Sequence, residues 1–259
     1  MAKIMTLRSL ALGARFLATA TAVLPVPTIS RAQAPQPPVL LRPGEVPGTG
    51  ASFPLSWTDP IFANVATSGS VVLSNGGLLT DKSITANGPQ ASVQCNGACT
   101  LTRVRISSGE GVRVGGSGAV VINSSWIESQ GVPGDHADSI QCYAPQDIGS
   151  VSIYNSTVHA HNDNATAGLF SADGYQGDFH LENVLFWGGP YGLRIHTDGK
   201  PTNVYMKNVY FVGPFLYSRM LIYDGGSGVK PVITHWENVR DATIENGKLV
   251  PGTLIAQPN

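Results

Sequence analysis

The side chains best suited to acid–base chemistry are concentrated in short stretches of the chain. Residues 134–141 read Gly-Asp-His-Ala-Asp-Ser-Ile-Gln and supply Asp135, His136, Asp138 and Gln141. Carboxylates beside one another and beside imidazoles have their pKa values pushed apart, which separates an acid from a base. We therefore take this stretch as the candidate site, although any one of its aspartates could instead hold a bend by accepting backbone N–H groups.

A second polar stretch, residues 159–164, follows about 20 residues later and offers His159, His161 and Asp163. Three further aspartates follow this stretch, each in an Asp-Gly dipeptide after a strand-like segment. The dipeptides start at residues 173, 198 and 224. A recurring Asp-Gly dipeptide is typical of a structural turn, so these three aspartates are set aside as catalytic candidates.

One short pattern organises the elements that must position these groups. Within residues 119–239 an apolar strand meets an asparagine and continues into a second strand five times, at Asn123, Asn155, Asn183, Asn208 and Asn238. The spacings of 32, 28, 25 and 30 residues fit a solenoid coil better than a hairpin. Asparagines on successive coils can hydrogen-bond to one another and tolerate a left-handed bend. The sequence therefore predicts an all-β fold, a parallel β-helix with an asparagine ladder.

Each coil is predicted to hold three short strands, with a loop of variable length after the first. The second strands are expected at residues 112–114, 140–142, 168–170, 193–195 and 220–222. Alternation along these strands turns one set of side chains into the core. The inward set is Ile140, Cys142, Phe170, Leu193 and Ile195. The outward residues form two columns, one of Arg113, Gln141, Leu169 and Arg194 and one of Tyr143, Ser171 and His196.

Three parallel strands per coil with an asparagine ladder resemble the right-handed parallel β-helix of the pectate-lyase-like superfamily. The resemblance covers roughly residues 70–245. A right-handed connection is also the general rule for parallel strands in one sheet. The resemblance implies a substrate groove over the sheet of second strands, walled by the variable loops. It does not identify a family within the superfamily, because one fold supports several reactions.

Lyases of this superfamily cleave uronic-acid polymers by β-elimination, which requires a base for the C5 proton and positive charge beside the substrate carboxylate. The outward columns and the polar loop before them make Arg194 and His196 the central candidate catalytic groups, with His136 and Asp138 beside them. Substrate contacts are expected from Gln141, Tyr143, Arg113, Arg219 and Tyr191. Pectate lyases use an arginine as the base and hold Ca²⁺ with aspartates. The resemblance therefore implies Arg194 as the base, and Asp135, Asp163 or Asp138 as candidate ligands for the ion.

Two other functions remain open. A glycoside hydrolase on the same groove would use two carboxylates from Asp135, Asp138 and Asp163. The chain lacks the paired aspartates and the Gly-His-Gly motif of polygalacturonases, so the site of that family is not carried over. The other alternative is a non-catalytic glycan-binding surface protein that uses the same groove. Aromatic side chains such as Trp187, Tyr191 and Tyr217 could stack on sugars in an enzyme or in such a binder.

The N-terminal residues are interpreted as segments outside the helix. A basic start, an apolar middle and the small residues around Arg31 predict a signal peptide over residues 1–32. Its apolar part is shorter than the roughly 20 residues of a membrane span. We therefore expect a secreted or periplasmic protein with no membrane span after processing.

The remaining boundaries follow from composition. Residues 33–69 are expected to form a Pro- and Gly-rich leader and N-terminal cap, with a short helix whose cap is Thr58. Residues 70–245 are expected to form the β-helix, and residues 246–259 a C-terminal tail.

Charge and cysteine content bound the partners and the redox state. Removal of residues 1–32 leaves 12 basic and 17 acidic residues, which argues against nucleic acid or an anionic membrane as a partner. We expect a monomer with a polysaccharide as its substrate. In an oxidising compartment Cys95 and Cys99 are predicted to form a disulfide, and Cys142 is predicted to be a buried free thiol.

Overall fold

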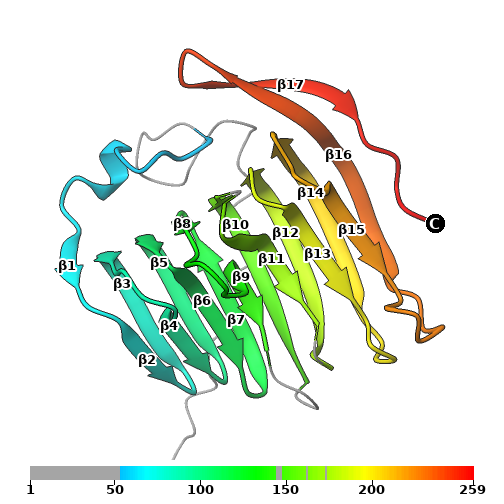
Figure 1. Ribbon diagram of the computed structural model, residues 1–259, viewed down its shortest axis with the longest axis horizontal. Helices are drawn as coiled ribbons and strands as arrows, with labels where there is room; N and C mark the ends of the chain where they lie inside the picture. Colours follow the sequence, from blue (N-terminus) through cyan, green and yellow to red (C-terminus); the bar gives the residue numbers. More distant parts are fainter. Residues whose placement is uncertain (1–52, 144–147, 162, 173) are drawn as a thin grey trace, which may run out of the picture. The chain divides into compact units, whose positions relative to one another are not determined.

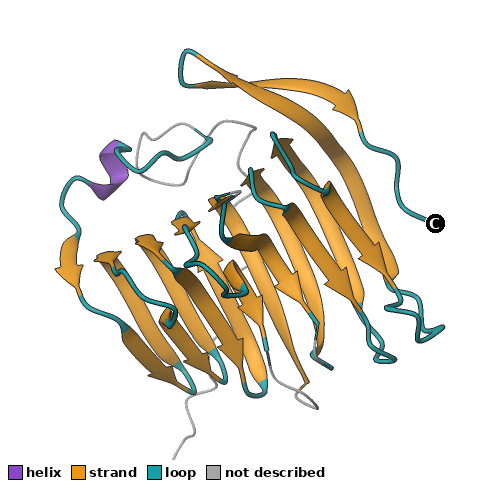
Figure 2. Cartoon of the chain, in the orientation of Figure 1, coloured by secondary structure: helices purple, strands orange, loops and turns teal. Residues whose placement is uncertain are grey.

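The computed structural model describes residues 53–143, 148–161, 163–172 and 174–259, all within one compact unit, Val39–Asn259. The predicted signal peptide and residues 33–52 of the predicted leader lie outside the described residues. The described chain is built from β-strands and one short 3₁₀ turn, with no α-helix in these ranges (Figure 2). Nowhere in this described part is there a helix with the length and apolar character needed to cross a membrane.

All seventeen strands of the described residues belong to two sheets, and the chain passes back and forth between them (Figure 1). The ten-stranded sheet consists of β1 (Ala66–Ser68), β3 (Gly77–Thr85), β5 (Cys99–Ser108), β7 (Gly118–Asn123), β8 (Trp126–Ser129), β10 (Ile148–Ala160), β12 (Gln176–Trp187), β14 (Asn203–Val212), β16 (Val232–Glu245) and β17 (Lys248–Leu254). The seven-stranded sheet consists of β2 (Val71–Ser74), β4 (Ala91–Asn96), β6 (Glu110–Gly115), β9 (Ala137–Cys142), β11 (Ala165–Ser171), β13 (Tyr191–His196) and β15 (Ser218–Tyr223).

Neighbouring strands in both sheets are parallel, apart from the antiparallel pair β16 and β17. The prediction of an all-β chain with parallel strands in stacked sheets is therefore confirmed, and the arrangement is compatible with a β-helix solenoid. β17 lies within the predicted C-terminal tail.

The long strands of the ten-stranded sheet bend where one residue adopts a left-handed backbone. The bend residues have φ values of 50–56° and are Asp81, Arg103, Ser124, Asn155, Asn183, Asn208 and Asn238. Asparagine and aspartate tolerate this conformation better than other residues with a side chain. The bend between β7 and β8 falls on Ser124, one residue after the predicted Asn123.

Side-chain amides link the bends to one another. Each Nδ2 donates to the Oδ1 of the asparagine before it in the series, over 3.1 Å from Asn155 to Asn123, 3.1 Å from Asn183 to Asn155, 3.0 Å from Asn208 to Asn183 and 2.7 Å from Asn238 to Asn208. Arg240 Nε closes the series by donating to Asn238 Oδ1 over 2.6 Å. Polar groups at the bends are thereby paired with one another.

The first two bends use an ion pair in place of amides. Arg103 donates from Nε to Asp81 Oδ1 over 2.6 Å and from Nη2 to Asp81 Oδ2 over 2.7 Å. These hydrogen bonds lower the pKa of the Asp81 carboxyl. The bends are therefore stabilised by an ion pair at Asp81 and Arg103 and by amide hydrogen bonds further along the chain.

Apolar side chains from the facing sheets fill the space between them. Ile140, Cys142, Leu193 and Ile195 are fully buried there, as the alternation predicts. Phe186 and Phe211, on adjacent strands, stack with their ring centres 5.5 Å apart. The core is thus continuous along the length of the two sheets.

The predicted orientation of β11 is wrong by one residue. Leu169 and Ser171 are buried, whereas Phe170 is half-exposed and pairs with Gln141 on one side and Arg194 on the other. The register shift between β9 and β11 at Ala165 and Ala167 accounts for the error. Because Leu169 and Phe170 are both apolar, the pattern of residue types could not reveal the shift.

Residues 53–65 cover part of the outer face of the ten-stranded sheet. Leu55 and Phe62 pack against Trp126, and Thr157 Oγ1 donates to the Leu55 carbonyl over 2.8 Å. The predicted short helix is present as one 3₁₀ turn, η1 (Pro60–Phe62). Its cap is Asp59, whose carboxylate accepts the Ile61 N–H, so the prediction of Thr58 as the cap is wrong.

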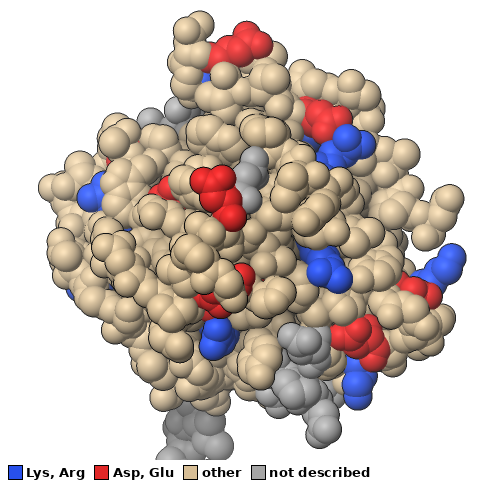
Figure 3. All heavy atoms as spheres, in the orientation of Figure 1, with Lys and Arg blue, Asp and Glu red and all other residues tan. Residues whose placement is uncertain are grey.

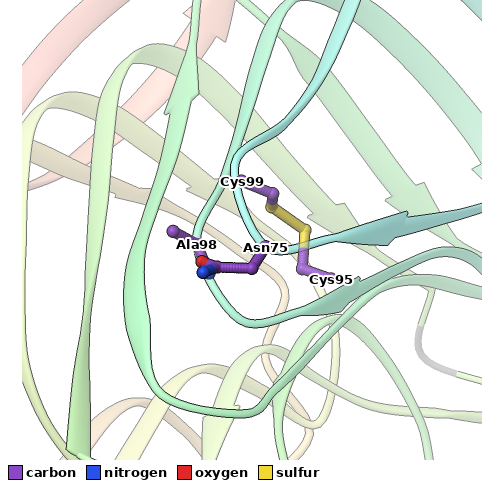
Figure 4. Close-up of a disulfide and its surroundings, with 4 residues drawn as sticks. All are labelled: Asn75, Cys95, Ala98 and Cys99. Atoms are coloured by element: carbon purple, nitrogen blue, oxygen red, sulfur yellow. A yellow bond between two sulfur atoms is a disulfide. The ribbon is translucent and has the colours of Figure 1, made fainter.

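The predicted disulfide between Cys95 and Cys99 is confirmed (Figure 4). It closes a tight turn between β4 and β5, where Asn75 Oδ1 also accepts the Ala98 N–H over 3.2 Å. The predicted burial of Cys142 as a free thiol is also confirmed. Burial raises the pKa of this thiol, and the nearby Asp138 contributes to the rise.

Candidate functional site

A pocket of about 540 Å³ lies on the outer side of the seven-stranded sheet. It is formed by β9, β11 and β13 together with the loops that precede β9 and β15. Its lining residues are His136, Asp138, Gln141, Thr166, Phe170, Tyr191, Arg194 and Tyr217. The structure therefore brings five of the predicted site residues together, namely His136, Asp138, Gln141, Tyr191 and Arg194.

Arg194 is held in this pocket by aromatic rings. Its guanidinium carbon lies 4.8 Å from the centre of the Phe170 ring and 5.5 Å from that of Tyr191. Nη2 donates to Tyr223 Oη over 3.1 Å, and Nε is buried with no hydrogen-bond partner. Among the described residues no carboxylate forms an ion pair with Arg194, so its positive charge is available to a ligand.

Asp138 is the acidic residue that lines the pocket, and its side chain is only 1% exposed. Burial raises its pKa well above the ordinary value of 3.8, and the charge of Glu110 adds to the rise. The Ala167 N–H and the Arg194 guanidinium oppose it. Asp138 Oδ1 is also buried without a hydrogen-bond partner. A protonated carboxyl in this position can donate a proton to a bound molecule.

A second buried acid, Glu110, is the residue whose charge acts on Asp138, and it was not predicted. It forms a bidentate ion pair with Arg113, in which Nε donates to Oε1 over 2.8 Å and Nη2 donates to Oε2. Burial raises the pKa of Glu110, and the hydrogen bonds from Arg113 oppose the rise. The charge of Arg113 is therefore already paired with Glu110. Arg113 also does not line the pocket, so its role here is structural.

His196 does not line the pocket either. Its ring is 12% exposed, with Nδ1 2.6 Å from Asp198 Oδ1 and the ring centre 5.3 Å from that of Tyr223. Asp198 has φ of 47° and accepts the Gly174 N–H over 2.9 Å, in keeping with a turn residue. His196 therefore supports Tyr223, which in turn accepts a hydrogen bond from Arg194.

Four other predicted site residues lie away from the pocket lining. Tyr143 is 51% exposed beside Arg113, and Arg219 pairs with Asp241 over 3.3 Å at a separate pocket of about 420 Å³. Asp163 is exposed, and Asp135 Oδ1 accepts the His136 N–H over 2.8 Å. Neither aspartate belongs to a group of three ligating side chains in the described ranges.

Three lining residues were not in the site predicted for a lyase: Thr166, Phe170 and Tyr217, of which Tyr217 was predicted only as a ring that stacks on sugars. Tyr217 is 70% exposed, and its ring centre lies 5.4 Å from that of Tyr191. The two rings form an aromatic surface at the rim of the pocket, which suits the apolar face of a sugar. Only the corrected register of β11 identifies Phe170 as a lining residue.

A cluster with metal-ligating side chains lies on the outer face of the ten-stranded sheet. Glu128, His159 and His161 place one ligand atom each within 4.8 Å of the others. Burial alone would raise the pKa of Glu128, but the two imidazoles outweigh it and bring this pKa to about 2. Charged side chains are few and scattered on the face seen in Figure 3.

Comparisons with protein-family models, with curated proteins and with solved structures find no match. The function of the protein is therefore inferred from its own residues and their geometry.

Proposed function

We propose that the chain is a right-handed parallel β-helix with three strands per coil and an asparagine ladder, as in the pectate-lyase-like superfamily. The parallel pairing, the left-handed bends and the amide hydrogen bonds in series support this proposal. Each bend divides a long strand into two, and the strand in the seven-stranded sheet supplies the third. The right hand follows the general rule for parallel strands.

We propose further that the protein is a secreted polysaccharide lyase that cleaves an acidic, uronate-containing polysaccharide by β-elimination. The observation that carries this proposal is Arg194, a cation in the pocket whose guanidinium contacts two aromatic rings and has no ion-pair partner in the described chain. A planar guanidinium can donate two parallel hydrogen bonds to a sugar carboxylate. The pocket is therefore suited to an anionic sugar.

The roles in the reaction follow from the chemistry of each lining group. A base takes the proton from C5, the electron pair forms the C4=C5 double bond, and the bond from C4 to the glycosidic oxygen breaks. Guanidinium groups stay protonated in proteins, so Arg194 stabilises the carboxylate charge and the imidazole of His136 acts as the base. The buried carboxyl of Asp138 supplies the proton to the departing oxygen.

The same pocket is poorly suited to a glycoside hydrolase. That reaction requires two carboxylates about 5–9.5 Å apart on either side of the scissile bond. Among the described acidic residues, Asp138 is the one that lines the pocket. This observation favours elimination over hydrolysis through Asp135, Asp138 or Asp163.

A screen of purified protein on polymers of galacturonate, glucuronate, mannuronate and guluronate tests the proposal, each with and without chelator. Elimination is followed by the ultraviolet absorbance of the conjugated C4=C5 double bond. We expect absorbing products from at least one polymer. Products without absorbance would identify a hydrolase, and binding without products would identify a glycan-binding protein that uses the Tyr191 and Tyr217 rings.

A further inference from the structure

The cluster of Glu128, His159 and His161 lies outside the pocket and has no role in the elimination reaction. Glu128 on β8 and His159 on β10 are direct partners in the parallel register. Their side chains therefore leave the same face of the ten-stranded sheet from adjacent strands, about 4.8 Å apart. His161, two residues after His159, lies on the same side and brings its Nε2 to 2.6 Å from Glu128 Oε1.

The distances in this cluster are close to those of a tetrahedral metal site. With metal–ligand bonds of about 2.0–2.2 Å, neighbouring ligand atoms of a zinc ion lie roughly 3.3–3.6 Å apart. His159 Nδ1 is 3.5 Å from Glu128 Oε1. The His161 side chain is 41% exposed, so its ring is free to move outward by the roughly 1 Å that a bound ion requires.

The position of His159 is fixed before any ion binds. Its ring stacks on Trp187 with centres 4.8 Å apart and meets the edge of Trp126 at 5.7 Å. Its backbone carbonyl accepts a hydrogen bond from Ser139 Oγ over 2.6 Å. Its Nδ1 is buried, faces Glu128 and makes no hydrogen bond within normal geometry. A buried imidazole nitrogen that makes no hydrogen bond is costly unless a proton donor or a metal ion satisfies it.

We propose that Glu128, His159 and His161 bind a divalent transition-metal ion, preferentially Zn²⁺, with one coordination position open to solvent. Two imidazoles and one carboxylate are ligands that Zn²⁺ accepts, whereas Ca²⁺ requires six or more oxygen atoms. The ion joins β8 to the end of β10 on the face that residues 55–62 partly cover. Its role is to stabilise the packing of adjacent coils, and it is independent of the elimination reaction.

Isothermal titration of tag-free, chelator-treated protein with Zn²⁺ tests this proposal. We expect one ion per chain, and at free Zn²⁺ about 100 times the dissociation constant a rise of about 5–10 °C in melting temperature. Glu128→Gln and His161→Ala each remove one ligand and should weaken binding by more than about tenfold. Both positions tolerate substitution, because Glu128→Gln conserves shape and His161 is largely exposed.

His235→Ala is the matched control. His235 also pairs with a glutamate, Glu237, over 3.0 Å, but it lies on β16 and is not part of the cluster. Zn²⁺ affinity should be unchanged in this variant. Absence of Zn²⁺ binding by the wild-type protein would overturn the proposal. Equal affinities in the wild-type protein, Glu128→Gln and His161→Ala would also overturn it, since Zn²⁺ would then bind elsewhere.

Discussion

Replacement of Asn183 by alanine should destabilise the fold strongly, although this residue is far from the proposed chemistry. The Asn183 side chain is 7% exposed, donates to Asn155 over 3.1 Å and accepts from Asn208 over 3.0 Å. The two lost hydrogen bonds cost about 2 kcal/mol together. Alanine must also keep φ near 55°, which costs about 1 kcal/mol more. We therefore expect a loss of about 3 kcal/mol in unfolding free energy.

Glycine at the same position separates the two contributions. Asn183→Gly loses the same hydrogen bonds but adopts the left-handed backbone without strain, so its expected loss is about 2 kcal/mol. Asn203→Ala is the control, because Asn203 is exposed and its amide bonds to Asp178 at the surface. That change should cost less than about 0.5 kcal/mol.

Urea unfolding followed by circular dichroism measures all three variants at one pH. The expected order of stability is wild type, Asn203→Ala, Asn183→Gly and Asn183→Ala. If Asn183→Ala were no less stable than Asn203→Ala, the amide series would contribute nothing to stability. If the glycine and alanine variants were equal, the left-handed bend would impose no strain.

Three further predictions concern the pocket and the disulfide. Since the folded protein holds the pKa of Asp138 above its ordinary 3.8, the unfolded chain loses this proton first as pH rises, so wild-type stability should fall from about pH 4 upward. Asp138→Asn removes that loss, so the melting temperature of the variant should rise relative to that of the wild type as the pH increases. If the difference between the two melting temperatures did not change with pH, this prediction would be refuted. Replacing Cys95 and Cys99 with serine should lower the unfolding free energy by about 2 kcal/mol in urea titrations, and reductant should give the same loss in the wild type. Tyr217→Ala should raise KM several-fold with kcat little changed in steady-state assays, because an exposed ring at the rim binds sugar without contacting the reacting atoms; a fall in kcat alone would contradict this role.

The repeats and the alternation along strands could be predicted because the asparagines mark the same point on successive coils. The aligned asparagines identify the strand that holds Arg194, and alternation with the apolar residues Leu193 and Ile195 then predicts that Arg194 points outward. The orientation of Phe170 could not be predicted in this way. A bulge lies between β9 and β11, and Leu169 and Phe170 satisfy an inward position equally well by residue type.

The Glu128 cluster was missed for a similar reason of register. The bend lies at Ser124, not at Asn123. Glu128 is four residues after the bend at Ser124, and His159 is four residues after the bend at Asn155, so the two residues are in register. Counting from Asn123 shifts Glu128 out of line with His159. The buried pairing of Arg113 with Glu110 is likewise invisible in residue spacing, because burial and not sequence separation decides which cation is left free.

The most direct test of the central claim compares the products of wild type, Arg194→Lys and Arg219→Lys on the preferred uronate polymer. Arg219 pairs with Asp241 at a separate pocket. Arg219→Lys therefore also replaces one guanidinium with an ammonium group but leaves the candidate pocket unchanged. We predict ultraviolet-absorbing products whose summed mass equals that of the substrate, a loss of about 100-fold or more in rate for Arg194→Lys, and a rate near wild type for Arg219→Lys. Products that together are one water molecule heavier per cleavage and do not absorb, or equal rates for the two variants, would contradict the assignment.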